Sequence, residues 1–238
     1  MTPQSRAIPV ILTRPAAQGD RFAADLHARF GDAVDVILSP LIAPVFPAVT
    51  LPDGDFRAVI LTSETGAQAA ARLPGVPRRA WCVGDRTAAT ARALGFDAQS
   101  AAGDADALVA AIVAADESGP LIHLRGRDSR GEVAARLTAA GVLTTEVIVY
   151  AQEAQPLTDA AYAVLNGLDP VIVPLFSPRT AQLFAATQPT APLFIAALSS
   201  AVAAGLGELP CQKVIVAVKP DASALLQALV PLMDAARA

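Results

Sequence analysis

Aromatic residues and lysine are both scarce in this sequence, and each shortage restricts the class of protein. Aromatics make up 5% of the 238 residues and hydrophobic residues 53%, so a core must be built from Ala, Val, Leu and Ile. This composition is typical of buried parallel strands and Ala-rich helices, not of an aromatic-rich β-sandwich. A net charge of −4 argues against a nucleic-acid partner, which requires a basic surface.

Lysine occurs only at Lys213 and Lys219, so nearly all of the 18 basic residues are arginine. Arginine binds carboxylate or phosphate through a planar, two-pronged contact, which keeps an anionic small ligand open. A GC-rich genome would favour arginine as well, and both explanations stay open.

Cysteines, targeting segments and long apolar runs are also few. Cys82 and Cys211 have no metal-ligand spacing and lie in apolar segments, which predicts reduced, buried thiols in a cytoplasmic protein. Pro9 breaks the apolar run near the N-terminus, so we expect no signal peptide. Residues 180–207 carry no charge, as in a membrane span, but Gln, Pro and Ser residues interrupt this stretch, so we do not expect it to cross a membrane. The sequence therefore predicts a soluble chain with no membrane partner.

The common catalytic motifs are missing too. The sequence has no G-x-S-x-G, P-loop, dinucleotide fingerprint or H-E-x-x-H. Its two histidines, His27 and His123, do not adjoin a nucleophile motif. We interpret His123 as a hydrogen-bonded strand residue rather than as a base.

Short β-branched runs alternate with Ala-rich stretches, which is typical of βα units around a parallel sheet. A proline-rich segment at 39–54 cannot be helical and is interpreted as an extended linker, and 150–159 is a shorter segment of the same kind. We predict strands at 8–13, 34–38, 58–62, 79–83, 97–100, 120–124, 145–150, 170–175, 193–197 and 213–218, with helices including 18–30, 87–94, 129–140 and 221–235.

The two halves of the sequence repeat one another. "ILTRPAA" corresponds to "IHLRGRD", "LTSETGAQ" to "LFSPRTAQ", and "VGDRTAATARAL" to "AALSSAVAAGLG". All three matches share an offset of about 110 residues, which indicates an internal duplication.

The duplication predicts how the chain divides into lobes. Residues 53–149 form one lobe, residues 1–38 and 158–238 together form the other, and 39–52 and 150–157 connect them. The predicted fold class is α/β, with two pseudo-symmetric, flavodoxin-like parallel-sheet lobes joined by a two-stranded connector. We expect a cleft between the lobes that closes on ligand binding.

Polar residues gather where the predicted strands end, and ligands of open parallel sheets bind at that edge. A Ser or Thr there can cap the next helix, which is the better-supported role for any one of them, while the same amides can hold a carboxylate. Arg125, Arg127 and Arg130 form either a solvated helix start with Asp128 or an anion site. The candidate ligand-binding residues are Thr13, Arg14, Thr62, Ser63, Gly84, Thr87, Arg125, Gly126, Ser177, Ser199 and Ser200.

Six short motifs follow one another along the chain: T-R-P at 13–15, T-S at 62–63, V-G-x-x-T-A at 83–88, R-G-x-x-x-R at 125–130, Tyr150, and F-S-P at 176–178. Together these motifs resemble the uroporphyrinogen-III synthase family over nearly the whole chain. The sequence departs from the family at the segment after the T-S, which is ETGAQ here, at Ala197, where the family has glycine, and at Ser200, where it has threonine.

The resemblance implies two α/β lobes and a cyclising lyase that needs no cofactor or metal. Its substrate would be hydroxymethylbilane, a linear tetrapyrrole, which is closed to uroporphyrinogen III while ring D inverts through a spiro intermediate. Arginines and strand-end amides would hold the carboxylates and orient the chain. Tyr150 would donate a proton to the departing hydroxyl, or else only pack at the hinge.

A free cleft and the lack of an interface stripe predict a monomer. The resemblance also implies that the substrate arrives in a transient handover from the preceding pathway enzyme. Two alternatives stay open. One is a non-catalytic bilobal small-molecule binding or sensor protein. The other is a nucleotide-using flavodoxin-like enzyme, although the sequence lacks the Gly-rich phosphate loop that this would need.

Overall fold

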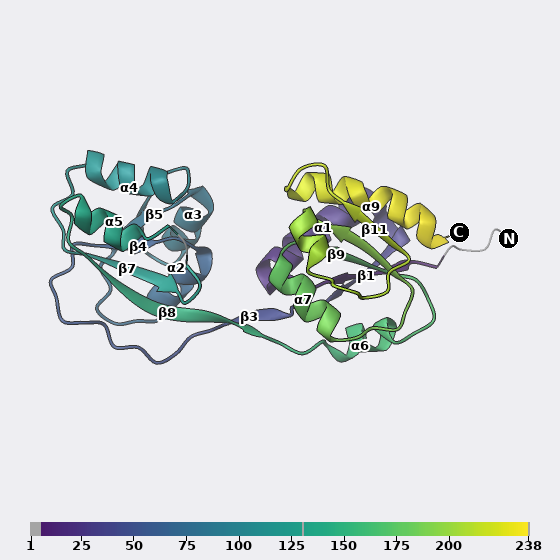
Figure 1. Ribbon diagram of the computed structural model, residues 1–238. Coiled ribbons are helices and arrows are strands. Elements are labelled where there is room, and N and C mark those ends of the chain that lie inside the picture. The colour runs from purple at the N-terminus through teal and green to yellow at the C-terminus, as the bar shows by residue number, and fades with distance from the viewer. Residues whose placement is uncertain (1–5, 130, 238) are drawn as a thin grey trace. The chain divides into compact units, whose positions relative to one another are not determined.

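A computed structural model describes residues 6–129 and 131–237, which fold as two compact units (Figure 1). Unit 1 comprises the described residues up to Ala43 and from Glu153 onward, and unit 2 spans Pro44–Gln152. The chain therefore passes between the units twice, and unit 1 is discontinuous in sequence.

Unit 1 contains a five-stranded sheet whose pairs are all parallel. Its strand order is β11-β10-β9-β1-β2, which is the flavodoxin-like order 2-1-3-4-5 when the strands are counted along the chain. The strands are β1 (Ile8–Leu12), β2 (Val34–Leu38), β9 (Val171–Leu175), β10 (Leu193–Ala197) and β11 (Lys213–Val216).

Helices cover both faces of this sheet, so the central strands are apolar throughout. Alternate residues of one strand face opposite helix layers: Val171 and Val173 pack towards one layer, and Ile172 towards the other. One layer is α1 (Ala16–Phe30), followed by the 3₁₀ turn Gly31–Ala33, with α9 (Ala222–Arg237); the other is α6 (Asp159–Leu165), α7 (Pro178–Ala186) and α8 (Ser200–Ala204).

Unit 2 contains a six-stranded sheet in the order β3-β8-β7-β4-β5-β6. The four pairings from β8 to β6 are parallel. The strands are β3 (Ile42–Val45), β4 (Ala58–Leu61), β5 (Arg79–Cys82), β6 (Asp97–Ser100), β7 (Leu121–Gly126) and β8 (Thr144–Ala154).

The helices of unit 2 also form two layers. Helices α2 (Glu64–Ala70) and α3 (Asp85–Ala93) pack on one face of the sheet through small alanine side chains. Helices α4 (Ala105–Ala114) and α5 (Val133–Ala139) pack on the other face (Figure 1). Unit 2 is therefore a three-layer α/β/α sandwich.

The two sheets have the same order once the strands are matched by repeat. In unit 2, β8-β7-β4-β5-β6 corresponds to β2-β1-β9-β10-β11 of unit 1. Each sheet thus takes its first two equivalent strands from one half of the sequence and the other three from the other half. The predicted fold class, α/β with two pseudo-symmetric parallel-sheet lobes, is confirmed.

Three features differ from the sequence prediction. The proline-rich segment contains strand β3, and Pro44 is tolerated there because β3 lies at the edge of the sheet. Strand β8 continues to Ala154, so Tyr150 lies within a strand. Helix α5 starts at Val133 rather than at 129, because Gly131 and Glu132 both have positive φ.

The two cysteines are free. Cys82 is buried, and burial raises the pKa of its thiol to about 11. Cys211 is only partly buried, which corrects the prediction that both thiols are buried. None of the helices in the described part of the chain has the length and apolarity needed to cross a membrane.

Candidate active site

A cavity of about 350 Å³ opens at the carboxyl edge of the unit 2 sheet. It lies where strands β4 and β7 end and helices α2 and α4 begin, which is the edge where open parallel sheets bind ligands. Its lining residues are Thr62, Ser63, Val83, Asp104, Ala105, Gly126, Asp128, Ser129 and Tyr150.

Ser63 and Tyr150 bring their hydroxyls together in this cavity. Ser63 follows β4 and caps α2, because its Oγ accepts a hydrogen bond of 2.9 Å from the amide of Gly66. The same Oγ lies 2.9 Å from Oη of Tyr150. Two candidate residues from different strands therefore form one hydrogen-bonded pair that faces the cavity.

Gly126 lies directly beneath the ring of Tyr150. A Cβ atom at Gly126 would lie 2.6 Å from Cζ of Tyr150, closer than real Cβ contacts. The requirement for glycine is steric, since Gly126 is not among the glycines with positive φ. A register shift after Arg125 pairs Gly126 with Tyr150 across β7 and β8. The absence of a side chain at Gly126 therefore leaves the space that the tyrosine ring occupies.

Thr62 lines the cavity from the end of β4 and bonds to a buried histidine behind it. Oγ1 of Thr62 lies 3.3 Å from Nε2 of His123, whose exposed fraction is 2%. Burial lowers the pKa of His123 to about 4; the Glu146 carboxylate opposes this shift and the Arg125 guanidinium adds to it. The imidazole is therefore neutral at neutral pH, and the prediction of a hydrogen-bonded strand residue is confirmed.

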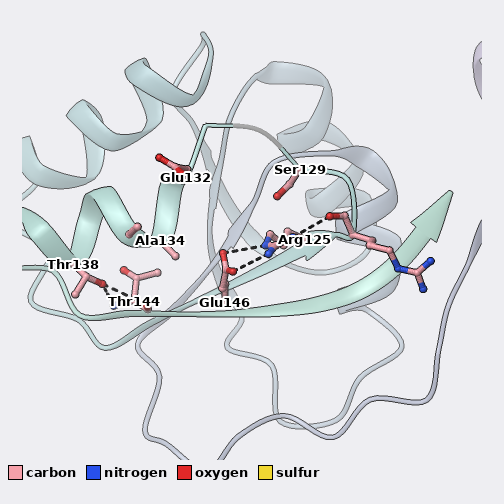
Figure 2. A pocket seen from close by; sticks show the side chains of 9 residues that line it. Arg125, Ser129, Glu132, Ala134, Thr138, Thr144 and Glu146 are labelled. Carbon is pink, nitrogen blue, oxygen red and sulfur yellow. Dashed lines mark hydrogen bonds and ion pairs between the residues drawn. The ribbon is translucent and has the colours of Figure 1, made fainter. Parts of the chain in front are cut away.

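Arg125 is held by an ion pair on the same face of the sheet as His123. Its guanidinium donates to both carboxylate oxygens of Glu146, at 2.7 and 3.0 Å (Figure 2). Nη1 also donates to the carbonyls of Gly126 and Arg127, at 3.0 and 3.3 Å. The hydrogen-bonded pair raises the pKa of Arg125 and lowers that of Glu146.

The Arg125–Glu146 pair lines a second cavity of about 580 Å³, away from Tyr150. Ser129 contributes to both cavities, so the two adjoin there. The predicted partner Arg130 lies outside the described residues. The other lining residues of the second cavity are Arg127, Glu132, Ala134, Ala135, Thr138 and Thr144 (Figure 2).

Gly84 and Thr87 lie at the start of α3, on the same edge of unit 2. Gly84 is the N-cap of α3 and Thr87 is buried within its first turn. Together with Arg86 and Gly103 they border an open hollow that is separate from the cavity of Tyr150.

The remaining candidates lie at strand ends of unit 1. Ser177 caps α7 with a bond of 3.1 Å from the Thr180 amide, and Ser199 caps α8. Ser200 is the first residue of α8. The capping role is thus confirmed for Ser63, Ser177 and Ser199.

Thr13 and Arg14 follow β1 in unit 1. Thr13 is fully buried, and its Oγ1 has no hydrogen-bond partner among the described residues. The guanidinium of Arg14 lies 3.8 Å from the ring centroid of Phe176, which fixes its plane by a cation–π contact.

Several cavity and supporting residues were not singled out from the sequence as site residues. Asp104 caps α4 by accepting hydrogen bonds from the amides of Asp106 and Ala107, and this bonding lowers its pKa. Asp128 and Ser129 lie inside the arginine motif. Glu146 carries no local signal, because its role depends on the register of β7 against β8. No cluster of metal-ligating side chains occurs in the part of the chain that the structure describes.

Two units of flavodoxin-like strand order, with hydroxyls and arginines at their strand ends, define the class of bilobal α/β proteins that bind ligands at those ends. The model of one family, described as uroporphyrinogen-III synthase HemD, matches residues 20–227. The chain therefore belongs to the uroporphyrinogen-III synthase family, and it is a cyclising lyase of porphyrin biosynthesis.

A solved structure supports the fold. Uroporphyrinogen-III synthetase from Helicobacter pylori 26695 matches with a TM-score of 0.63 and 17% identity, over 95% of this chain and 99% of that one. A mutant uroporphyrinogen III synthase from the extremely thermophilic bacterium Thermus thermophilus gives a TM-score of 0.42 and 13% identity, over 96% and 100% of the two chains. The curated proteins gave no significant match.

Proposed function

We propose that the protein closes hydroxymethylbilane to uroporphyrinogen III, with inversion of ring D through a spiro intermediate. Membership of the family supports this reaction. The observation that carries the site assignment is the hydrogen-bonded pair of Ser63 and Tyr150, which faces a cavity at the carboxyl edge of a parallel sheet.

The chemical demand on the enzyme is mainly orientation. A pyrrole nitrogen pushes out the hydroxyl of hydroxymethylbilane, the C–O bond breaks, and the oxygen leaves as water. Oη of Tyr150 supplies the proton that this oxygen takes up. Ring D then bonds through its substituted carbon to the methylene carbon that lost the hydroxyl, which gives the spiro intermediate. The original bridge bond to that ring D carbon breaks, and the freed bridge carbon bonds to the unsubstituted carbon of ring D next to its nitrogen. This carbon loses its proton to the Tyr150 phenolate, which restores the tyrosine. Ser63 Oγ holds the phenol in place for both transfers.

Binding rests on charge and on strand-end polar groups. The substrate bears acetate and propionate groups, and a charge-assisted hydrogen bond to each contributes on the order of 1.5–3 kcal/mol. Arg14 and the helix-start amides of each unit are suited to such groups. We assign binding roles to Thr13, Arg14, Thr62, Ser63, Gly84, Thr87, Ser177, Ser199 and Ser200.

Arg125 and Gly126 take supporting roles in this proposal. The Arg125 guanidinium is already bound by Glu146 and by two backbone carbonyls, one of them that of Gly126. Arg125 therefore fixes the backbone on which the Tyr150 ring lies.

The identity of the product tests the proposal. The protein is incubated with hydroxymethylbilane generated enzymatically, and the porphyrin isomer is identified after oxidation. We expect type III, whereas a heat-denatured control should give type I from spontaneous closure. Type I alone with the native protein would favour a non-catalytic binding or sensor protein.

Other expectations stay predictions. These are a monomeric state, substrate handover from the preceding enzyme, a cytoplasmic location, lobe closure on binding, and connector roles for 39–52 and 150–157. Light scattering of the purified protein checks the first.

A further inference from the structure

His123 is buried behind the cavity and reaches it only through another side chain. It lies in β7, where its Cα pairs with Ile60 of β4 on one side and Glu146 of β8 on the other. Thr62 lines the cavity and His123 does not. The bond of 3.3 Å between Nε2 and Thr62 Oγ1 is therefore the route by which the imidazole influences a ligand.

The other ring nitrogen decides which tautomer is present. Nδ1 of His123 is buried and has no hydrogen-bond partner among the described residues. A neutral imidazole has one N–H and one bare nitrogen. If Nδ1 carried the proton, a buried N–H would be unpaired, and orphaned N–H groups are rarer than unpaired acceptors in folded proteins. The proton therefore belongs on Nε2, which donates to Thr62.

This tautomer fixes the hydrogen-bond direction at Thr62. A threonine hydroxyl has one donor proton and two acceptor lone pairs. When Nε2–H donates to Oγ1, the hydroxyl keeps its proton for a group in the cavity. With the opposite tautomer the hydroxyl proton would point at Nε2, and only an acceptor would face the ligand.

We propose that His123 is a positioning residue that makes Thr62 a hydrogen-bond donor to a substrate carboxylate rather than an acceptor from a pyrrole N–H. The inference rests on the proposed function, because the carboxylate belongs to the tetrapyrrole. It specifies the direction of one hydrogen bond in that site, with Thr62 as the donor. It also places the substrate carboxylate at the end of β4.

The charged groups beside His123 are consistent with a neutral ring. Arg125 and Glu146 flank it from β7 and β8, act in opposite directions on its charge, and bind each other. The helices that pack on this face of the sheet contribute apolar side chains, including Leu108 of α4 and Leu137 of α5.

Nuclear magnetic resonance tests the tautomer directly in the whole, unliganded protein. The chain has only two imidazoles, so His27→Gln leaves His123 as the sole signal in a long-range ¹H–¹⁵N correlation. We expect a protonated Nε2 and a bare Nδ1 at pH 7. A protonated Nδ1 overturns the inference, whatever the activity of the protein.

Substitutions test the effect on the substrate. His123→Leu removes the donor and should raise KM about three- to tenfold, as expected for one hydrogen bond, with kcat little changed. Thr62→Val should do the same, and the double variant should be no worse than Thr62→Val alone, because His123 acts through Thr62. His123→Gln, which keeps a side-chain N–H donor, should restore most of the loss.

The outcomes separate the inference from the proposed function. If the wild-type protein gave only the type I product, the proposed function would be wrong, but the tautomer measured for His123 would still stand. Additive effects of His123→Leu and Thr62→Val on KM, or no rescue by His123→Gln in a variant whose thermal unfolding is unchanged, overturn the positioning role while the type III product stands.

Discussion

The hydroxyls of Ser63 and Tyr150 lie 2.9 Å apart, although 87 residues separate them in the sequence. Their strands are not neighbours either, because β7 lies between β4 and β8 in the sheet. The tyrosine side chain therefore crosses β7, and it does so over Gly126, the residue without a side chain. Three strands are needed to build this one contact.

Tyr150→Phe removes the hydroxyl and leaves the ring over Gly126. Turnover should fall by up to about 100-fold, the lower end of what a general acid contributes, because the pyrrole nitrogen already assists departure of the hydroxyl. KM should change little. Steady-state kinetics on hydroxymethylbilane checks this, with Tyr162→Phe, the other tyrosine, as the matched control. Unchanged turnover would remove Tyr150 from the mechanism.

Gly126→Ala places a methyl group against the tyrosine ring. Overpacking of this kind costs about 1–3 kcal/mol of unfolding free energy, and the ring must also move away from Ser63, so turnover should fall as well. Urea unfolding measures the first effect. In a Tyr150→Ala background the same substitution should cost almost nothing. An equal cost in both backgrounds would mean that something other than Tyr150 requires glycine here.

Arg125→Lys keeps the charge but loses the fork that holds Glu146 and two carbonyls. If Arg125 supports the backbone under Tyr150, kcat should fall severalfold while KM stays nearly constant. Arg57→Lys, at an exposed arginine of the same unit that lines neither cavity, is the matched control and should have no effect. A large rise in KM at constant kcat would instead assign Arg125 to direct substrate binding.

The pH dependence of stability should reveal His123. Its pKa is about 4 in the folded protein and 6.5 in an ordinary imidazole, so the unfolded chain binds the extra proton between these values. Stability is therefore retained above pH 6.5 and falls as the pH decreases towards 4, by at most about 3 kcal/mol.

Urea unfolding at pH 7 and pH 5 measures this loss above the range in which Glu146, with its lowered pKa, takes up a proton. His123→Gln should flatten the dependence between these two pH values. His27→Gln, which removes the other imidazole and keeps His123, should retain the wild-type slope. A wild-type slope in His123→Gln would show that a different group causes it.

Most of the fold was accessible from the sequence because its signals are local. Ten strands were predicted from β-branched runs, and each corresponds to an observed strand within a few residues. Strand β3 was missed because Pro44 lies in a proline-rich segment that argues against a strand, although proline is tolerated at a sheet edge. Helix α5 begins later than predicted because Gly131 and Glu132 have left-handed backbone conformations, and the helical sequence pattern does not indicate these conformations.

The site was predicted as a set of strand ends but not as a set of contacts. Ser63 was identified from its place after an apolar run, and its cap is a local consequence of that place. Its bond to Tyr150 depends on sheet order, and the role of Gly126 depends on a register shift between β7 and β8. Neither the sheet order nor the register shift can be predicted from the residues next to Ser63 or Gly126. Glu146, the partner of Arg125, was missed for the same reason.

The exchange of strands between the two halves of the chain also has a consequence during protein synthesis. All of unit 2 lies between the two segments of unit 1, so it is complete when the ribosome has released residue 152. Strand β1 has by then met only β2, because its other neighbour, β9, begins at Val171. One edge of β1 must therefore stay unpaired, while unit 2 is already complete, until residues 171–175 have emerged.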